Sequence, residues 1–261
     1  MISIFSEQGK ERLDAIVKKG MLCVFDFDGT LAPIVPHADQ AYLPDEVRVR
    51  LLDLMRLAPV AILTGRSIQD IRRRLGFDPT YALGNHGIEG LPGWETRTRQ
   101  YRDLCREWVD KLAAALRSDR NFDPAIEIED KQYSLSVHYR HTANQREMEK
   151  RLSELFSTLL PEARVIAGKC VFNLLPPEAE HKGSAMEKLM TLTGASSAIY
   201  VGDDITDEDV FGLRRPDMLS VRVEASDSSL ADVYLPHPDD ILILLDYLIK
   251  RLQQCAVKAT V

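Results

Sequence analysis

One short segment of this chain limits the possible folds more than any other: an apolar run that ends in two aspartates and a Gly-Thr pair. The run begins at Met21, and the aspartates are Asp26 and Asp28. A short apolar run bounded by a turn signal is typical of a strand buried in a sheet. Ligands of open α/β sheets bind beyond the carboxyl ends of such strands, so we expect both aspartates at the mouth of a site.

The two carboxylates are close enough in sequence to influence each other. Side chains two residues apart in an extended segment share a face, so Asp26 and Asp28 should repel each other unless a cation or a shared proton relieves them. A hard cation with oxygen ligands, Mg²⁺ by preference, meets that need. The alternative interpretation is a pair of turn-forming aspartates, because Asp-Gly is a common turn sequence.

A second apolar run, 59–63, is followed by Thr64, Gly65 and Arg66, and Ser67 is suitably placed to cap a helix. A threonine hydroxyl and backbone N–H groups at a helix start suit a phosphate oxygen. The alternative is an ordinary junction between a strand and a helix.

Two further segments carry charged groups that fit the same chemistry. Lys182 precedes a helical pattern, where it opposes the helix dipole and needs a compensating anion. The strand pattern 198–201 is followed by Asp203 and Asp204, at a place where a metal would need acids. Acids slightly further on, Glu208 and Asp209, are explained by a favourable acidic helix N-terminus alone.

These four segments, in this order, resemble the motifs of the haloacid dehalogenase superfamily of phosphohydrolases: Asp-x-Asp, then Ser or Thr, then Lys, then an acidic pair. Within that superfamily the chain is similar to the trehalose-6-phosphate phosphatases, from about Met21 to the last helix. That similarity is carried by Gly84–Glu89, Leu135–Arg140, His181–Gly183 and Gly202–Glu208. His181 departs from the pattern, because many relatives are expected to have an aspartate there; this affects the tuning of Lys182 and not the chemistry.

The periodicity and the resemblance predict the same fold class: an α/β protein with a Rossmann-like parallel sheet core and an inserted α+β cap. Strand and helix patterns alternate up to about Asn85 and again from Lys182, which is typical of a parallel sheet. Between them the order is helix, hairpin, helix, hairpin, which predicts an antiparallel sheet covered on one face by two helices. We expect residues 1–92 and 177–261 to form a catalytic core domain and residues 93–176 to form the cap.

The resemblance implies roles for the charged residues. Asp26 is the expected nucleophile, which forms an aspartyl phosphate, and Asp28 is the expected general acid and base. Thr64 and Lys182 are expected to bind the non-bridging phosphate oxygens. The expected Mg²⁺ ligands are Asp26, the main chain of Asp28, and Asp203; Asp204 or Asp207 would act through water.

Substrate recognition is expected on two surfaces. The polar face of the first hairpin resembles the cap surface that closes over a sugar, although a solvated face is the alternative. His86 could serve as a turn residue, and Arg140 as a surface salt bridge of little energetic value. The candidate substrate-binding residues are Gly65, Arg66, Asn85, His86, Glu129, Lys131, His138 and Arg140.

The expected reaction is Mg²⁺-dependent hydrolysis of trehalose 6-phosphate. The alternatives are hydrolysis of sucrose phosphate, glucosylglycerol phosphate or mannosyl phosphoglycerate, a sugar phosphomutase, and a non-catalytic sugar-phosphate sensor. The intact acids, threonine and lysine argue against the sensor, because binding alone does not need a proton donor.

Composition adds limits on partners and compartment. The 261 residues are 45% hydrophobic and carry a formal net charge of −7, which argues against nucleic acid or an anionic membrane surface as a partner. No window is long enough and apolar enough to span a membrane. The four cysteines lack metal-type spacing. A cytoplasmic monomer with reduced cysteines, acting on a small sugar phosphate, is therefore expected.

Overall fold

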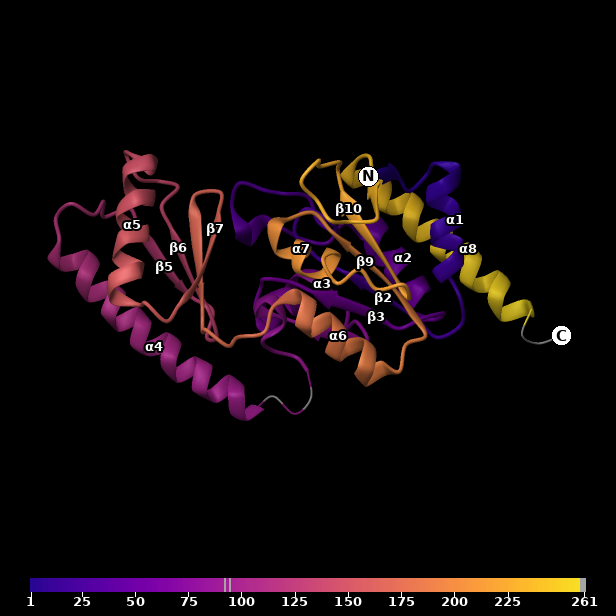
Figure 1. Cartoon of the computed structure of the whole chain (residues 1–261), viewed down its shortest axis with the longest axis horizontal. Helices are drawn as coiled ribbons and strands as arrows, with labels where there is room; N and C mark the ends of the chain where they lie inside the picture. Colours follow the sequence, from indigo (N-terminus) through magenta and orange to yellow (C-terminus); the bar gives the residue numbers. More distant parts are fainter. Residues whose placement is uncertain (92, 94, 259–261) are drawn as a thin grey trace. The chain divides into compact units, whose positions relative to one another are not determined.

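The computed structural model describes residues 1–91, 93 and 95–258 of the chain. The chain forms two compact units, shown in Figure 1, and each is described by itself. Unit 1 consists of Met1–Leu91 and Glu180–Val261, and unit 2 consists of Pro92–Ala179. Unit 1 is thus assembled from two stretches of chain that lie on either side of an insertion.

Unit 1 is built on a seven-stranded sheet in the order β1-β11-β10-β9-β2-β3-β4. All neighbouring strands run parallel, as the alternation of strand and helix patterns predicts. The strands are β1 Ile2–Ser3, β2 Met21–Phe25, β3 Val60–Leu63, β4 Tyr81–Leu83, β9 Ser197–Gly202, β10 Met218–Val223 and β11 Val233–Leu235.

Strand β2 lies between β3 from its own stretch of chain and β9 from the second stretch. Phe25, the last residue of β2, is paired with Val201 near the end of β9. Because parallel strands end at the same edge of a sheet, the residues that follow β2 and β9 come together there. This pairing is what brings Asp26 close to Asp203 across 177 positions of sequence.

Helices and short 3-10 turns connect these strands. The helices are α1 Glu7–Ile16, α2 Asp45–Met55, α3 Ile68–Leu75, α6 Lys182–Thr193, α7 Glu208–Phe211 and α8 Ile241–Lys258, and the 3-10 turns are η1 Ala38–Gln40, η2 Asn85–Gly87, η3 Ile205–Asp207 and η4 Pro238–Asp240. Strand β1 and helix α1 precede the first strand that the sequence pattern predicts. Helix α1 begins after Ser6, whose hydroxyl accepts a hydrogen bond from the backbone N–H of Gly9.

The sheet of unit 1 is buried on both faces. Met21, Cys23 and Phe25 of β2 belong to a core cluster that includes apolar side chains of α1, α2, α3 and α8. Leu22 and Val24, which alternate with them, are equally inaccessible, so they lie on the opposite face. Continuous apolar strands of this kind are typical of parallel sheets covered on both sides.

Unit 2 contains a four-stranded antiparallel sheet in the order β5-β6-β8-β7 and two helices. The apolar side chains of both helices join those of one sheet face in a single core cluster around Trp108, as the two hairpins predict. Its elements are α4 Glu95–Ser118, β5 Glu127–Asp130, β6 Leu135–His138, α5 Gln145–Leu159, β7 Arg164–Gly168 and β8 Val171–Leu175. The predicted fold class, a parallel core with an inserted α+β unit, is therefore confirmed.

No helix within residues 1–91 and 95–258 combines the length and the apolar character that crossing a membrane requires. The four cysteines are free thiols.

Helix α2 offers a matched test of the core of unit 1. Leu51 is completely inaccessible, whereas Val49 on the same helix is 52% exposed. We expect Leu51→Ala to lower the free energy of unfolding by about 2–5 kcal/mol, because it leaves a cavity, and Val49→Ala to change it by less than about 0.5 kcal/mol. Urea unfolding followed by circular dichroism measures both. Equal effects of the two changes would contradict this packing.

Candidate active site

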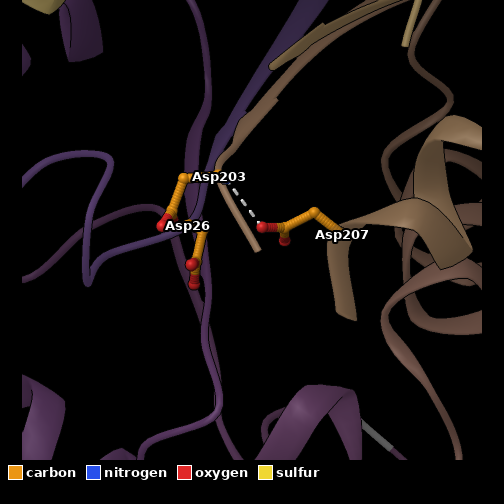
Figure 2. A group of neighbouring side chains, drawn as sticks. All are labelled: Asp26, Asp203 and Asp207. Atoms are coloured by element: carbon orange, nitrogen blue, oxygen red, sulfur yellow. Dashed lines mark hydrogen bonds between the residues drawn. The ribbon is translucent and has the colours of Figure 1, made fainter. Parts of the chain in front are cut away.

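Three acidic side chains from separate segments converge at the carboxyl edge of the parallel sheet. Asp26 follows β2, Asp203 follows β9, and Asp207 ends η3. Each offers a carboxylate oxygen, and these oxygens all lie within 4.8 Å of one another. Figure 2 shows the three side chains, with the Asp207 carboxylate directed toward the segment that carries Asp203.

Lys182 lies among these acids as a buried cation. Its Nζ is 3.0 Å from Oδ1 of Asp26 and 2.7 Å from Oδ1 of Asp207. The side chains of Lys182, Asp26 and Asp207 are 2%, 7% and 0% exposed. Burial alone would lower the pKa of Lys182, but the carboxylates of Asp207 and Asp26 outweigh that effect and raise it. The ammonium is therefore held charged beside Asp26.

Asp207 is fully engaged by hydrogen-bond donors. Oδ1 accepts from Lys182 Nζ at 2.7 Å and from the Tyr200 hydroxyl at 2.6 Å. Oδ2 accepts from the backbone N–H groups of Asp203 and Asp204, each at 2.9 Å. Four donors satisfy the lone pairs of a carboxylate, so Asp207 fixes both Lys182 and the chain that carries Asp203.

The acids outnumber the cation, which leaves the cluster short of positive charge. Burial, followed by the neighbouring charge of Asp207, raises the pKa of Asp203 to about 7. Burial also raises the pKa of Asp26, against the opposing effect of Lys182. Oxygen ligands with unmet negative charge are what hard divalent cations prefer. The residues present therefore fit a divalent cation, with Asp26 and Asp203 as the acids that are not already satisfied by donors from all sides.

Gly29 is what allows the two acidic segments to approach so closely. Its φ is +81°, and a Cβ placed on it would lie 2.1 Å from Oδ2 of Asp203. Any other residue would be strained in that backbone conformation and would clash with the carboxylate. The Asp-Gly pair that sequence reasoning treats as a turn signal thus also makes room for Asp203, whose Oδ1 accepts from the Thr30 hydroxyl at 3.2 Å.

The residues that follow β3 form a second, adjoining part of the site. Thr64 is buried, and its hydroxyl accepts from the backbone N–H of Arg66 at 3.2 Å. The ring of His86 packs against Gly65, where a Cβ would lie 2.6 Å from the ring. The Asn85 side chain donates to Glu89 at 2.7 Å. Asn85 and His86 are both buried, with positive φ, which makes this turn a packed feature of unit 1.

Asp28 has a different environment from Asp26. Its side chain is 42% exposed, and both of its oxygens accept hydrogen bonds from the Arg66 guanidinium. Asp204 is also exposed and lies outside the three-carboxylate group. Of the predicted catalytic and metal-binding residues, the structure therefore brings Asp26, Lys182 and Asp203 together. The carboxylate of Asp28 is instead bound by the Arg66 guanidinium.

The remaining candidate substrate-binding residues lie in unit 2. His138 Nε2 is 2.9 Å from Oε2 of Glu129, and Lys131 Nζ is 3.9 Å from the same oxygen. An Arg140 nitrogen donates to the backbone oxygen of Lys169 at 3.3 Å. The strand register places Glu129 and His138 on the sheet face opposite the helices, as the alternation in the first hairpin predicts.

Two polar residues, one in each unit, are not singled out by sequence reasoning. Tyr200 lies within β9, and its one available signal is a hydroxyl inside an otherwise apolar run, which needs a buried partner. Asn173 of β8 accepts from the Ser136 hydroxyl at 2.6 Å on the open face of the unit 2 sheet. The sequence signal for Asn173 is a polar residue that alternates with the apolar Phe172 and Leu174 in β8.

Solved structures share this architecture. The C-terminal domain of the trehalose-6-phosphate phosphatase from C. albicans superposes with a TM-score of 0.70 at 21% identity, over 94% of this chain and 97% of that domain. A haloacid dehalogenase-like hydrolase from Bacteroides thetaiotaomicron superposes with a TM-score of 0.61 at 16% identity, over 88% of this chain and 100% of that chain. The parallel sheet with its inserted α+β unit therefore has the haloacid dehalogenase-like fold.

Sequence comparisons are more specific. The trehalose-phosphatase family model matches residues 24–235, and the chain belongs to that family. A trehalose-phosphate phosphatase of Mycobacterium tuberculosis is 30% identical over 257 residues, and trehalose-phosphate phosphatase B of Arabidopsis thaliana is 31% identical over 223 residues. The alignments cover 95% and 78% of this chain, and they span 66% and 59% of the two relatives.

Asp207 provides a test of the cluster. We expect Asp207→Asn to lower the free energy of unfolding by about 3–5 kcal/mol, because an amide cannot accept from all four donors and leaves a buried charge or N–H without its partner. The control is Asp209→Asn on α7, whose side chain is 43% exposed; we expect it to change stability by less than about 1 kcal/mol. Urea unfolding compares the two, and near-equal stabilities would count against the network.

Proposed function

We propose that this chain is a Mg²⁺-dependent phosphatase that hydrolyses trehalose 6-phosphate to trehalose and inorganic phosphate. Family membership supports the substrate, and the convergence of Lys182, Asp26 and Asp203 carries the chemistry. Relatives of this family include proteins named trehalose-phosphate phosphatase in bacteria and plants. Residues 1–92 and 177–261 would then be the catalytic core domain, and residues 93–176 the cap.

In this proposal Asp26 is the nucleophile. Its carboxylate attacks phosphorus, the bond between phosphorus and the sugar oxygen breaks, and an aspartyl phosphate forms on Asp26. Lys182, 3.0 Å from Asp26, orients that carboxylate and offsets negative charge as the phosphoryl group approaches. Tyr200 and two backbone N–H groups donate to Asp207 and hold it in place. This supports the role of Lys182, because the fixed Asp207 carboxylate keeps the Lys182 ammonium beside Asp26.

Asp28 would deliver a proton to the departing sugar oxygen and then take one from the water that hydrolyses the aspartyl phosphate. Its partial exposure supports the role, since a group that exchanges protons with substrate and water needs access to both. Thr64 and the backbone N–H groups beside it would bind non-bridging phosphate oxygens.

Asp26, Asp203 and the main chain of Asp28 would hold Mg²⁺, with Asp204 outside the direct ligand set. The ion would offset the charge of the acids and of the phosphate and help to orient the phosphoryl group. The raised pKa values of Asp26 and Asp203 support this assignment, because a nucleophilic carboxylate must be ionised and a divalent cation favours that form.

The sugar would be recognised by the open sheet face of unit 2, through Glu129, Lys131, His138 and Arg140. A disaccharide presents many hydroxyl groups, which call for fixed donors and acceptors. The contact between Glu129 and His138 supports this, because it holds an acceptor and a ring nitrogen in place. Asn173 adds an amide to that face. Gly65 would line the approach to the phosphate in unit 1. The buried turn at Asn85 and His86 would support that loop, because their backbone N–H groups donate to the carbonyl oxygens of Arg66 and Thr64.

The test of the reaction is phosphate release with Mg²⁺ from trehalose 6-phosphate, sucrose phosphate, glucosylglycerol phosphate, mannosyl phosphoglycerate and glucose 6-phosphate. We expect stoichiometric phosphate from trehalose 6-phosphate, at a kcat/KM at least about tenfold above the others, because a set of hydrogen-bonding groups rejects analogues that lack the matching hydroxyls. EDTA and Asp26→Asn should each remove the activity.

The other outcomes are equally informative. Equal activity on every sugar would refute a dedicated disaccharide site. Transfer of phosphate to a second sugar position without release would show a mutase, and binding without turnover would show a sensor. Normal turnover by a folded Asp26→Asn protein would overturn the nucleophile assignment.

A second prediction concerns pH and the metal. The pKa of Asp203 is about 7 in the folded chain and about 3.9 when unfolded, so the folded state holds the extra proton between these values. The contribution of Asp203 to the stability of the metal-free protein should therefore fall as pH rises from about 4 to about 7. Below about pH 7, Mg²⁺ can bind Asp203 only by displacing this proton, whereas above about pH 7 the carboxylate is already ionised.

We therefore expect Mg²⁺ to raise the Tm more at about pH 8 than at about pH 5, as measured by thermal unfolding with and without the ion. Asp203→Asn should remove most of the increase at both pH values. A Mg²⁺-dependent increase in Tm that is as large at pH 5 as at pH 8 would contradict the assignment of Asp203.

A further inference from the structure

The Asp28 carboxylate is held at two points by one guanidinium group. Arg66 Nε donates to Oδ2 of Asp28 and Arg66 Nη2 donates to Oδ1, both at 2.6 Å. Parallel bonds of this kind fix orientation as well as distance, which a single lysine contact does not. The position of the Asp28 carboxyl group is therefore set by a residue 38 positions away, on the loop that follows the neighbouring strand β3.

Arg66 is itself held from two other sides. Its Nη1 donates to Oδ2 of Asp70 at 2.7 Å, and its guanidinium carbon lies 5.6 Å from the centre of the Phe27 ring. Only 11% of the Arg66 side chain is exposed. Because Phe27 is buried between Asp26 and Asp28, Arg66 is fixed against the segment whose aspartate it holds.

The chain of contacts continues into helix α3. Asp70 accepts from Arg74 through both oxygens, at 2.7 and 2.8 Å, and its backbone N–H donates to the Ser67 cap. Burial alone would raise the pKa of Asp70, but hydrogen bonds from Arg74 and Arg66 lower it. Asp70 thus stays charged, and the first turn of α3 anchors Arg66.

We propose that Arg66 is a positioning residue for the proton transfers of Asp28, and that Asp70 holds Arg66 in place for that task. This assignment rests on the proposed function. Sequence reasoning places Arg66 among the sugar-binding groups, but three of its N–H groups are directed at two carboxylates of its own unit. When Asp28 carries the proton to be transferred, Arg66 still donates to its other oxygen, and Asp70 and Phe27 keep the plane of the guanidinium in place.

The step that depends on this geometry is cleavage of the bond between phosphorus and the sugar oxygen. As Asp26 bonds to phosphorus, the electron pair of the breaking bond stays on the sugar oxygen, which takes the proton of Asp28. A sugar alkoxide is a poor leaving group and needs that proton. p-Nitrophenolate is a stable anion and leaves without it, so a misplaced Asp28 should slow the two substrates unequally.

The experiment is a comparison of first-turnover rates on trehalose 6-phosphate and on p-nitrophenyl phosphate, by rapid mixing with excess enzyme. The readout is the ratio of the two rates, because a general loss of structure slows both. We expect Arg66→Ala to lower the rate on trehalose 6-phosphate relative to that on p-nitrophenyl phosphate by about ten- to a hundredfold, because misplacing a general acid forfeits part of its contribution.

Two further variants allow the proposal to be tested even if Arg66→Ala folds poorly. Arg66→Lys keeps a cation beside Asp70 and Phe27 but cannot bind Asp28 at two points, so it should lower the ratio as well. Arg73→Ala is the matched control, because Arg73 is an exposed arginine on helix α3, which follows the Arg66 loop, and it should retain the wild-type ratio.

A double-mutant cycle assigns the effect to Asp28. Asp28→Asn should lower the ratio at least as much as Arg66→Ala, and adding Arg66→Ala to Asp28→Asn should lower it little further, because the two residues act as one unit. An unchanged ratio in both Arg66 variants, or an equal loss from Arg66→Ala with and without Asp28, would overturn the assignment. A wild-type chain that releases no phosphate from either substrate would instead overturn the proposed function, and this role with it.

Discussion

The arrangement of the site depends on one buried ammonium group. An isolated Lys182 charge would be strongly disfavoured in the interior, and it is stabilised there by Asp26 and Asp207, which come from the two separate stretches of chain in unit 1. Asp207 can serve because Tyr200 and two backbone N–H groups satisfy its other lone pairs. The same contacts that make the buried charge tolerable therefore also fix the distance between the nucleophile candidate and the acids after β9.

The cluster remains under-compensated, and this has a consequence for binding. Three carboxylates face one ammonium, and burial, together with the neighbouring carboxylates, raises the pKa values of Asp26 and Asp203. A phosphate dianion alone would meet repulsion there, whereas a divalent cation alone would be attracted. Cation and phosphate should thus favour each other's binding, since the cation restores the ionised acids and offers the phosphate a positive partner.

Sequence patterns predicted the elements that carry a repeating signal and missed those that depend on one contact. The apolar runs before Asp26 and Asp203 gave the two strands, and the parallel pairing then brought the acids together. Helix α1 has only a short amphipathic pattern, and β1 has two residues, so neither stands out in the sequence. The partner of Arg66 could not be predicted either, because periodicity gives the face of a residue within a strand and not the direction of a long side chain beyond its end.

The pair of aspartates also shows where the rule of alternation stops. Extended geometry predicts that Asp26 and Asp28 share one face and repel each other, but β2 ends at Phe25 and Gly29 turns the chain. Each carboxylate consequently has its own cation, Lys182 for Asp26 and Arg66 for Asp28. Among the effects on the Asp26 pKa, the charge of Asp28 ranks after those of burial, Lys182, Asp207 and Asp203. Separate cations, on one carboxylate that is buried and one that is 42% exposed, give two identical residues the different environments that a nucleophile and a proton carrier require.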